Sequence, residues 1–249
     1  MEALLTGRVA VVTGGTSGIG RATAVEFARQ GAKVVIAGRR ESEGAQTVRM
    51  IEEIGGEASF IQTDVSISED VENLIRKAIE LYERIDCAFN NAGYAGIPVG
   101  LTKTAEDEFD KIISTNLRGT FLCLKHEIAV MMQHGGAIVN AGSINGLAAS
   151  PGTSAYSATK GGIIAMSRTA ALEYARFRIR INVVSPGAIA TDMLAPLPDE
   201  SLKRLARAHP LGRLGTAQEV AKVAVWLCSD RASYVLGQNI MVDGGYTAQ

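Results

Sequence analysis

The sequence predicts an α/β fold in which a doubly wound, mostly parallel sheet carries helices on both faces. Seven short runs rich in apolar and β-branched residues recur along the chain, and helix-length segments separate them. The apolar residues in these runs are continuous rather than alternating, which is typical of strands buried on both faces of a parallel sheet. Strand–helix alternation also implies right-handed crossovers. We expect one domain over residues 1–249.

The expected strands follow one another at intervals that a helix fills. They are RVAVVTG (8–14), KVVIAG (33–38), ASFIQTDV (58–65), IDCAFNNAG (85–93), GAIVNAGS (136–143), RINVVSPG (180–187) and GQNIMVDGG (237–245). Segments 19–31 and 68–85 place apolar residues three and four positions apart, as helices do. The least regular stretch, about 188–214, holds three of the six prolines, and we expect it to be a substrate loop.

Composition narrows the class of protein. A formal net charge of −1 and the lack of a basic stripe argue against a nucleic-acid partner. No apolar run reaches the ~18 residues of a membrane span, so we expect no membrane partner. The N-terminal residues show no charged leader with a cleavage site, and we expect a cytoplasmic protein.

Cysteines and histidines show no metal-ligand spacing. The three cysteines are far apart in apolar sequence, which indicates buried reduced thiols. The three histidines are expected on the surface or in loops, so acid–base chemistry must fall to other residues. These residues are Cys87, Cys123, Cys228, His126, His134 and His209.

A glycine-rich turn, TGGTSGIG (13–20), joins the first strand directly to a helix. Gly14, Gly18 and Gly20 leave the backbone without side chains, so a pyrophosphate can approach the helix N-terminus. The alternative reading is an ordinary tight strand–helix connection.

Tyr156 and Lys160 are four residues apart in a stretch of small residues. On a helix they share one face, and a nearby cation favours the phenolate. Tyrosine has an ordinary pKa of about 10, so this pairing is a way to make it an acid or base near pH 7. The alternative is an amphipathic surface pair.

Several motifs occur together and in one order. They are TGGTSGIG, NNAG (90–93), Asn116, Ser143, YSATK (156–160) and SPGAIATDM (185–193). In this the chain resembles the short-chain dehydrogenase/reductase family over nearly all of its length. The resemblance implies a Rossmann-type fold with seven parallel strands, a nicotinamide cofactor, and hydride transfer between an alcohol and a carbonyl compound.

The resemblance also implies roles for four catalytic residues. Tyr156 is expected to exchange the proton, and Lys160 to support it while binding the nicotinamide ribose. Ser143 is expected to donate a hydrogen bond to the substrate oxygen, although a serine after a strand also caps turns. Asn116 is expected to bend its helix and to hold a water that links Lys160 to solvent.

The cofactor contacts that the resemblance implies are spread over the chain. They are Gly14, Thr16, Ser17, Gly18, Ile19, Gly20, Arg39, Asp64, Val65, Asn90, Ala92, Gly93, Tyr156, Lys160, Pro186, Gly187, Ile189 and Thr191.

The second strand favours NADP(H) over NAD(H). It ends at Gly38, where the NAD-type pattern has an acid, and Arg39 follows with a cation suited to a 2′-phosphate. Arg40 is either a second phosphate contact or a solvated charge. Against this preference, Ser17 is not the basic residue that some NADP-using relatives carry, and Glu41 lies close by.

The expected substrate is an uncharged, moderately hydrophobic ketone or secondary alcohol, because no charged residue is among the expected pocket walls. Those walls are Tyr94, Ile97, Leu147, Met193, Leu194 and Leu197. A 3-oxoacyl carrier-protein reductase is the alternative, with Lys203, Arg204 and Arg207 as a patch for an acidic carrier. A regulator that binds the nucleotide without catalysis is disfavoured by the intact Ser143, Tyr156 and Lys160.

Two further expectations concern assembly and the chain terminus. The resemblance and the small residues around Tyr156 favour a homotetramer. The ending VDGGYTAQ (242–249) is similar to that of certain R-specific alcohol dehydrogenases in the family, which implies that Gln249 holds a structural magnesium ion. A disordered tail is the alternative.

Overall fold

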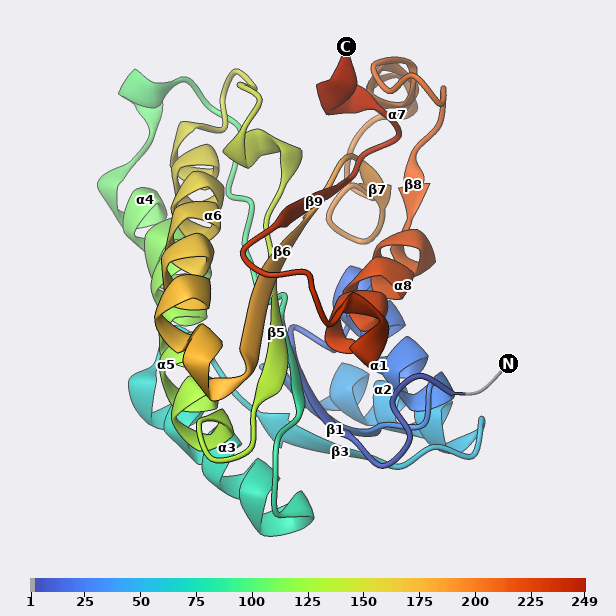
Figure 1. The fold of residues 1–249 in the computed structure, drawn as a ribbon. Coiled ribbons are helices and arrows are strands. Elements are labelled where there is room, and N and C mark those ends of the chain that lie inside the picture. Colours follow the sequence, from blue (N-terminus) through green and yellow to red (C-terminus); the bar gives the residue numbers. More distant parts are fainter. Residues whose placement is uncertain (1–2) are drawn as a thin grey trace.

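The computed structural model describes residues 3–249 and centres on a seven-stranded parallel sheet (Figure 1). Every strand that the sequence predicts is present. In chain order they are β1 (Val9–Thr13), β2 (Lys33–Gly38), β3 (Ala58–Gln62), β4 (Cys87–Asn90), β5 (Gly136–Ala141), β6 (Ile179–Pro186) and β9 (Asn239–Val242). The spatial order is β3-β2-β1-β4-β5-β6-β9, so the direction of winding reverses between β1 and β4. In open α/β sheets such a reversal leaves a crevice outside the carboxyl ends of the strands.

Helices cover both faces of the sheet (Figure 1). They are α1 (Gly18–Arg29), α2 (Glu41–Glu52), α3 (Ser68–Tyr82), α4 (Glu106–Ile112), α5 (Gly119–Met131), α6 (Ser154–Tyr174), α7 (Asp199–Arg207) and α8 (Ala217–Cys228). Side chains of α1, α2 and α8 pack on one face and those of α3, α5 and α6 on the other. Val12 of β1 enters the first core and Val11 the second, which explains why the strands are apolar without interruption.

A second, two-stranded sheet was not predicted. In it β7 (Ile189–Ala190) pairs in parallel with β8 (Gly215–Thr216). The nitrogen of Gly215 donates a hydrogen bond to the carbonyl oxygen of Ala188 at 2.9 Å. This pairing brings the two ends of the expected substrate segment together, and α7 lies within that segment. Strands of two residues are too short to give a periodic signal in the sequence.

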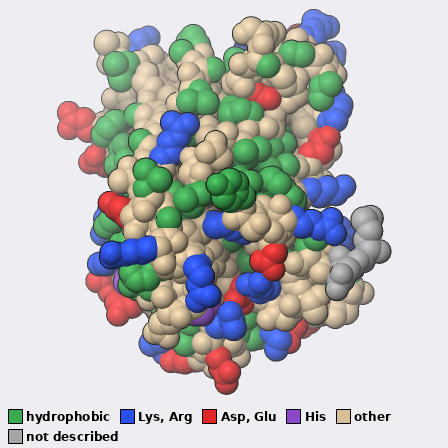
Figure 2. Space-filling model, viewed as in Figure 1, with side chains coloured by type: hydrophobic (Ala, Val, Ile, Leu, Met, Phe, Trp, Pro, Cys, Tyr) green, Lys and Arg blue, Asp and Glu red, His purple; other side chains and the backbone are tan. Residues whose placement is uncertain are grey.

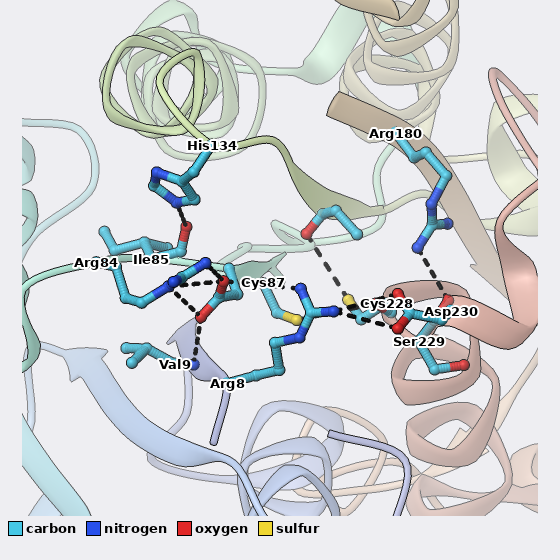
Figure 3. A network of polar contacts seen from close by, with 12 residues as sticks. Arg8, Val9, Arg84, Ile85, Cys87, His134, Arg180, Cys228, Ser229 and Asp230 are labelled. Atoms are coloured by element: carbon cyan, nitrogen blue, oxygen red, sulfur yellow. Dashed lines mark hydrogen bonds and ion pairs between the residues drawn. The ribbon is translucent and has the colours of Figure 1, made fainter. Parts of the chain in front are cut away.

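Opposite the carboxyl edge, the strands begin in a network of charged groups. The carboxylate of Asp86 is buried and accepts hydrogen bonds from the backbone nitrogen of Val9 and from Arg84 Nε, both at 2.9 Å. Arg8 lies 3.7 Å from Asp86 and 3.2 Å from Asp230, which follows α8 (Figure 3). These bonds hold the starts of β1 and β4 side by side, and so help to align the ends where the crevice lies.

The described cysteines are all free and buried, as the sequence indicates. Burial raises the pKa of the Cys123 thiol. The pKa of the Cys87 thiol is also raised, mainly by its hydrogen bond to Cys228 and next by burial. Within residues 3–249, no helix has the length and apolar character needed to cross a membrane.

A buried carboxyl group lies beneath the end of β4. Glu127 of α5 is fully buried and accepts a hydrogen bond from Asn90 Nδ2 at 2.8 Å, while its second oxygen has no partner among the described residues. Burial raises the pKa of Glu127 from 4.5 to about 7. The folded state therefore loses stability relative to the unfolded chain as the pH rises from about 4.5 to about 7.

We predict that Glu127→Gln stabilises the protein at pH 8. A carboxyl whose pKa is raised in the folded state contributes full stability only below its unfolded pKa and loses it as pH rises through the folded pKa. The neutral amide avoids this loss, worth up to about 3 kcal/mol in the free energy of unfolding. Urea unfolding at pH 5 and pH 8 checks this prediction. The stability gained by Glu127→Gln should largely vanish at pH 5, and an equal gain at both pH values would contradict the raised pKa of Glu127.

Candidate active site

The glycine turn lies at the reversal point of the sheet. Gly14 has a φ of 65° and Gly18 a φ of 50°, conformations that side-chain-bearing residues rarely adopt. A Cβ at Gly14 would lie 2.8 Å from Asn91 Nδ2, and one at Gly20 would lie 2.1 Å from the carbonyl oxygen of Gly14. Gly20 therefore allows α1 to pack on the turn, and Gly14 allows the segment after β4 to pack against it, while Gly18 leaves the start of α1 without a side chain.

The N-terminus of α1 suits an anionic group. Ser17 is the N-cap residue, its side chain makes no capping hydrogen bond, and the first turn contains no acid. The leading backbone N–H groups of a helix have no partner within it and carry partial positive charge. Together with the bare glycine surface, this end of α1 fits the pyrophosphate of a dinucleotide.

A cleft of about 400 Å³ lies over this turn, at the carboxyl ends of the strands. It contains most of the cofactor contacts that the sequence implies: Gly14, Thr16, Ser17, Gly18, Ile19, Arg39, Asp64, Val65, Ala92, Gly93 and Thr191. A smaller cavity of about 130 Å³ shares Ile19, Gly93 and Thr191 with it and adds Ser143, Tyr156, Lys160, Pro186, Gly187 and Ile189. The structure thus brings the two groups of predicted residues to one continuous site.

Two expected cofactor contacts lie elsewhere. Gly20 is buried behind the turn, and Asn90 is buried against Asn140 and Glu127. The neighbouring Asn91 lines both cavities instead, and its side chain donates to the carbonyl oxygens of Thr13 and Gly14 at 3.3 Å. Adjacent residues at a strand end face opposite sides, so a motif of two asparagines leaves the choice between them open.

Ser143 and Tyr156 line the same small cavity from different elements. Ser143 follows β5 and is almost fully buried, whereas Tyr156 lies on α6 and is partly exposed. The Ser143 side chain lowers the pKa of the Tyr156 phenol and accepts a hydrogen bond from the nitrogen of Asn145 at 3.1 Å. The serine therefore caps a turn, and its hydrogen bond to a substrate oxygen stays a prediction.

Lys160 lies one turn further along α6, with only 4% of its surface exposed. Its Nζ donates to the carbonyl oxygen of Ala141 at 2.7 Å and lies 5.5 Å from the centre of the Tyr156 ring. Burial lowers the pKa of Lys160 from 10.5 to about 8. The hydrogen bond to Ala141 thus fixes the ammonium group near the Tyr156 ring, and burial disfavours its charged form.

The Tyr156 pKa is raised in the polypeptide by itself, so Lys160 alone does not produce the lowering expected from Lys160 together with an oxidised nicotinamide ring. Burial raises the pKa of the phenol, and the hydrogen bond with Ser143 opposes this only in part. Lys160 directs its ammonium group at the Ala141 carbonyl oxygen, which it bonds directly. The electrostatic work assigned to Lys160 therefore also needs the positive charge of an oxidised nicotinamide ring.

Asn116 is fully buried in a π-helical turn (Ile113–Arg118) between α4 and α5, so the helix is interrupted where the sequence suggests a bend. Its Oδ1 accepts from the nitrogen of Tyr94 at 2.7 Å. Its Nδ2 donates to the Tyr94 carbonyl oxygen at 2.9 Å and to Thr159 Oγ1 at 3.2 Å. Asn116 thus fixes the chain after β4 against α6, and its part in a proton relay stays a prediction.

The substrate walls differ from expectation. Met193 and Leu194 line the smaller cavity, whereas the side chain of Tyr94 is turned toward α4. The Tyr94 hydroxyl donates to Glu108 Oε1 at 2.8 Å, and Lys111 Nζ lies 4.4 Å from the ring centre. Ile97, Leu147 and Leu197 are not among the residues that line the cavity.

His209 lies in the loop after α7, as the sequence suggested, but it is buried, with 3% of its surface exposed. It follows α7 and contacts the backbone just after Gly187. No regular spacing marked this residue, because its partners come from distant segments.

This arrangement of a parallel sheet, a glycine turn and a serine–tyrosine–lysine group is that of an oxidoreductase. Comparison with known proteins identifies the group: the chain belongs to the short-chain dehydrogenase/reductase family. Residues 14–247 match a family model described as enoyl-(acyl carrier protein) reductase. The chain is therefore an enzyme of a family that acts on CH–OH donors and uses a nicotinamide cofactor.

Relatives of several specificities cover nearly the whole chain. The A-factor type gamma-butyrolactone 1′-reductase (1S-forming) of Streptomyces virginiae is 39% identical, over 99% of this chain and 98% of its own. The 3-oxoacyl-[acyl-carrier-protein] reductase FabG of Thermotoga maritima is 38% identical, over 97% and 98%. The crystal structure of levodione reductase superposes with a TM-score of 0.95 at 37% identity, over 98% and 99% of the two chains.

We predict that Tyr156→Phe lowers kcat by about 10²–10⁴-fold, because a positioned proton donor contributes that much. Dissociation constants for the dinucleotide should stay within about threefold, since only one hydroxyl is lost. Steady-state turnover and cofactor titration measure the two effects. Ser143→Ala is the companion variant, and a Tyr156→Phe enzyme that keeps more than a tenth of its kcat would contradict the proton-donor role.

Proposed function

We propose that the protein is an NADP-dependent oxidoreductase that interconverts an uncharged, moderately hydrophobic ketone and the matching secondary alcohol. The observation that carries this proposal is that Ser143 and Tyr156 both line the smaller cavity, which shares Ile19, Gly93 and Thr191 with the dinucleotide cleft. Lys160 is the only charged side chain that lines the smaller cavity among the described residues, and its ammonium group is bonded to Ala141. A substrate carboxylate or phosphate would find no free cation there.

The chemistry follows from where the protons are held. A nicotinamide cofactor in the cleft would supply the hydride to the carbonyl carbon, or remove it from the alcohol. In reduction, the Tyr156 phenol gives its proton to the carbonyl oxygen, and the Ser143 hydroxyl donates a hydrogen bond to the same oxygen. Lys160 stabilises the phenolate that remains through its nearby positive charge. Alcohol oxidation uses the same groups in reverse, with Tyr156 as the base.

Two arginines support the preference for NADP(H). Arg39 lies beside Gly38 on the cleft wall and pairs with Asp64 at 3.7 Å. Arg40 Nη2 donates to Ser17 Oγ at 2.8 Å and to Thr16 Oγ1 at 3.2 Å, so its guanidinium lies on the glycine turn. Arg40 thereby supplies a cation next to Ser17, the position at which some NADP-using relatives carry a basic residue and this chain does not.

We predict that Arg39→Ala and Arg40→Ala each weaken NADPH binding about tenfold, the lower end of the effect of a hydrogen bond to a charged group, because both side chains are largely exposed. NADH binding should change less than twofold. Fluorescence titration of both cofactors provides the measurement, and Arg49→Ala on the exposed side of α2 is the matched control. A wild-type kcat/KM that is higher with NADH would overturn the preference.

Reduction of carrier-bound 3-oxoacyl groups is the second candidate. Lys203, Arg204 and Arg207 are exposed on α7, which belongs to the same segment as the cavity residues Met193 and Leu194. A cation patch there suits an acidic carrier, although Lys203 already pairs with Glu200 at 3.3 Å. This placement keeps the carrier-protein alternative open.

We predict that cofactor oxidation is faster with uncharged cyclic and aliphatic ketones than with an acetoacetyl thioester. The physical reason is the uncharged lining of the smaller cavity. Absorbance at the reduced-nicotinamide band measures each rate. Faster turnover of the thioester, lost when Lys203, Arg204 and Arg207 are replaced together by alanine, would favour the carrier-protein reductase instead. Cofactor binding without turnover of any compound would favour a regulator.

We also propose that the protein forms a homo-oligomer, most simply a homotetramer with two-fold symmetry. The outer edge of β9 ends the sheet, and hydrophobic side chains gather across the middle of the face on which it lies (Figure 2). Leu172 on α6 is 75% exposed and Phe121 on α5 is 50% exposed, which suits helices that meet a second copy. The magnesium ion expected at Gln249 stays a prediction; in the structure the Gln249 amide donates to the carbonyl oxygen of Ala208.

A further inference from the structure

The backbone of Gly187, Ala188 and Ile189 is a wall between two cavities. On one side it lines the smaller cavity that contains Ser143 and Tyr156. On the other side it lines a separate cavity of about 310 Å³, behind the active site. Residues that contact this backbone from the rear cavity therefore help to set its position in the smaller cavity.

His209 contacts the wall from the rear cavity. The backbone nitrogen of Ala188 donates to His209 Nε2 at 3.1 Å, and His209 Nδ1 lies 2.7 Å from the carbonyl oxygen of Leu205. A backbone N–H can only donate, so Nε2 is the acceptor and Nδ1 carries the proton. The imidazole is thus neutral, in a single tautomer, and both of its nitrogens are used.

The ring also fixes the wall by close packing. A Cβ at Gly187 would lie 2.7 Å from His209 Nε2 and 2.9 Å from the Cα of Asp243, so only glycine fits between them. The Tyr246 ring lies against the imidazole with a centroid distance of 5.0 Å. The wall is therefore held between a buried histidine and the C-terminal segment.

The charged groups around the ring are occupied with other partners. Asp243 accepts hydrogen bonds from the nitrogens of Gly245 and Thr247 and from Thr247 Oγ1. Arg213 pairs with Glu219 at 2.6 Å across the same cavity. The hydrogen bond from Ala188 is thus the polar contact that His209 makes with the wall, and it joins the end of α7 to the backbone that lines the smaller cavity.

We propose that His209 is a positioning residue for the nicotinamide half of the cofactor site. It acts through its hydrogen bond with the Ala188 N–H, which holds the Gly187–Ile189 backbone in the position that nicotinamide binding requires. The proposal rests on the proposed function, because it needs a nicotinamide cofactor beside Tyr156. It assigns His209 no role in proton transfer, since the ring faces the rear cavity.

The test compares a whole cofactor with a fragment that lacks the nicotinamide ring. His209→Leu keeps similar bulk but removes the acceptor, whereas His209→Gln places an amide oxygen where Nε2 lies. His134→Gln is the matched control, because His134 Nε2 bonds the carbonyl oxygen of Ile85 at the opposite edge of the sheet (Figure 3). Calorimetric titration with NADP⁺ and with 2′-phospho-ADP-ribose gives the two dissociation constants for each variant.

We expect His209→Leu to weaken NADP⁺ binding about tenfold, while binding of 2′-phospho-ADP-ribose stays within twofold. The substitution removes the hydrogen bond to the Gly187–Ile189 backbone and leaves the part of the cleft that would bind adenosine unchanged. His209→Gln should bind NADP⁺ within about threefold of wild type, and His134→Gln should bind both compounds as wild type does.

Three results would overturn the proposal. One is a His209→Leu variant that binds NADP⁺ as tightly as wild type does. Another is an equal loss of affinity for cofactor and fragment, which would mark a general structural defect. The third is a His209→Gln variant as weak as His209→Leu. If the wild type does not bind NADP⁺, the same comparison is made with NAD⁺ and ADP-ribose. A wild type that binds neither NADP⁺ nor NAD⁺ would overturn the proposed function as well.

Discussion

Packing of α1 on the turn after β1 is the constraint on which the site depends. The helix starts so close to the strand that a Cβ at Gly20 would lie 2.1 Å from the carbonyl oxygen of Gly14. That contact brings the helix N-terminus to the point where the sheet reverses its winding. The proposed cofactor cleft and the smaller cavity with Ser143 and Tyr156 both lie along the edge that this contact defines.

The proposed catalytic group includes a side chain that is costly to bury. Lys160 is kept 4% exposed, and burial brings its pKa to about 8, so at neutral pH a charge is held where solvation is poor. The hydrogen bond to the carbonyl oxygen of Ala141 compensates in part. Such a group makes sense where a reaction transiently places negative charge on Tyr156, since a desolvated cation acts more strongly on its neighbour.

Residues 188–214, the expected substrate segment, are fixed to the rest of the protein at both ends. Pairing of β7 with β8 closes the base of the segment, and His209 joins the end of α7 to Ala188. A substrate that contacts Met193 or Leu194 would therefore touch a segment that also contacts the Gly187–Ile189 backbone through His209.

The sequence by itself determined all seven strands of the sheet, the glycine turn, and the grouping of Ser143, Tyr156 and Lys160 at one edge. The strands follow from local periodicity and the Tyr156–Lys160 pair from one helical turn, whereas the resemblance to the family added Ser143 to that pair. Tertiary structure alone decided that Asn91 rather than Asn90 faces the cleft, that Tyr94 turns to Glu108, and that His209 is buried. It also decided that burial outweighs Ser143 in setting the Tyr156 pKa. Each of these depends on which distant side chains share a volume, and no spacing along the chain records that.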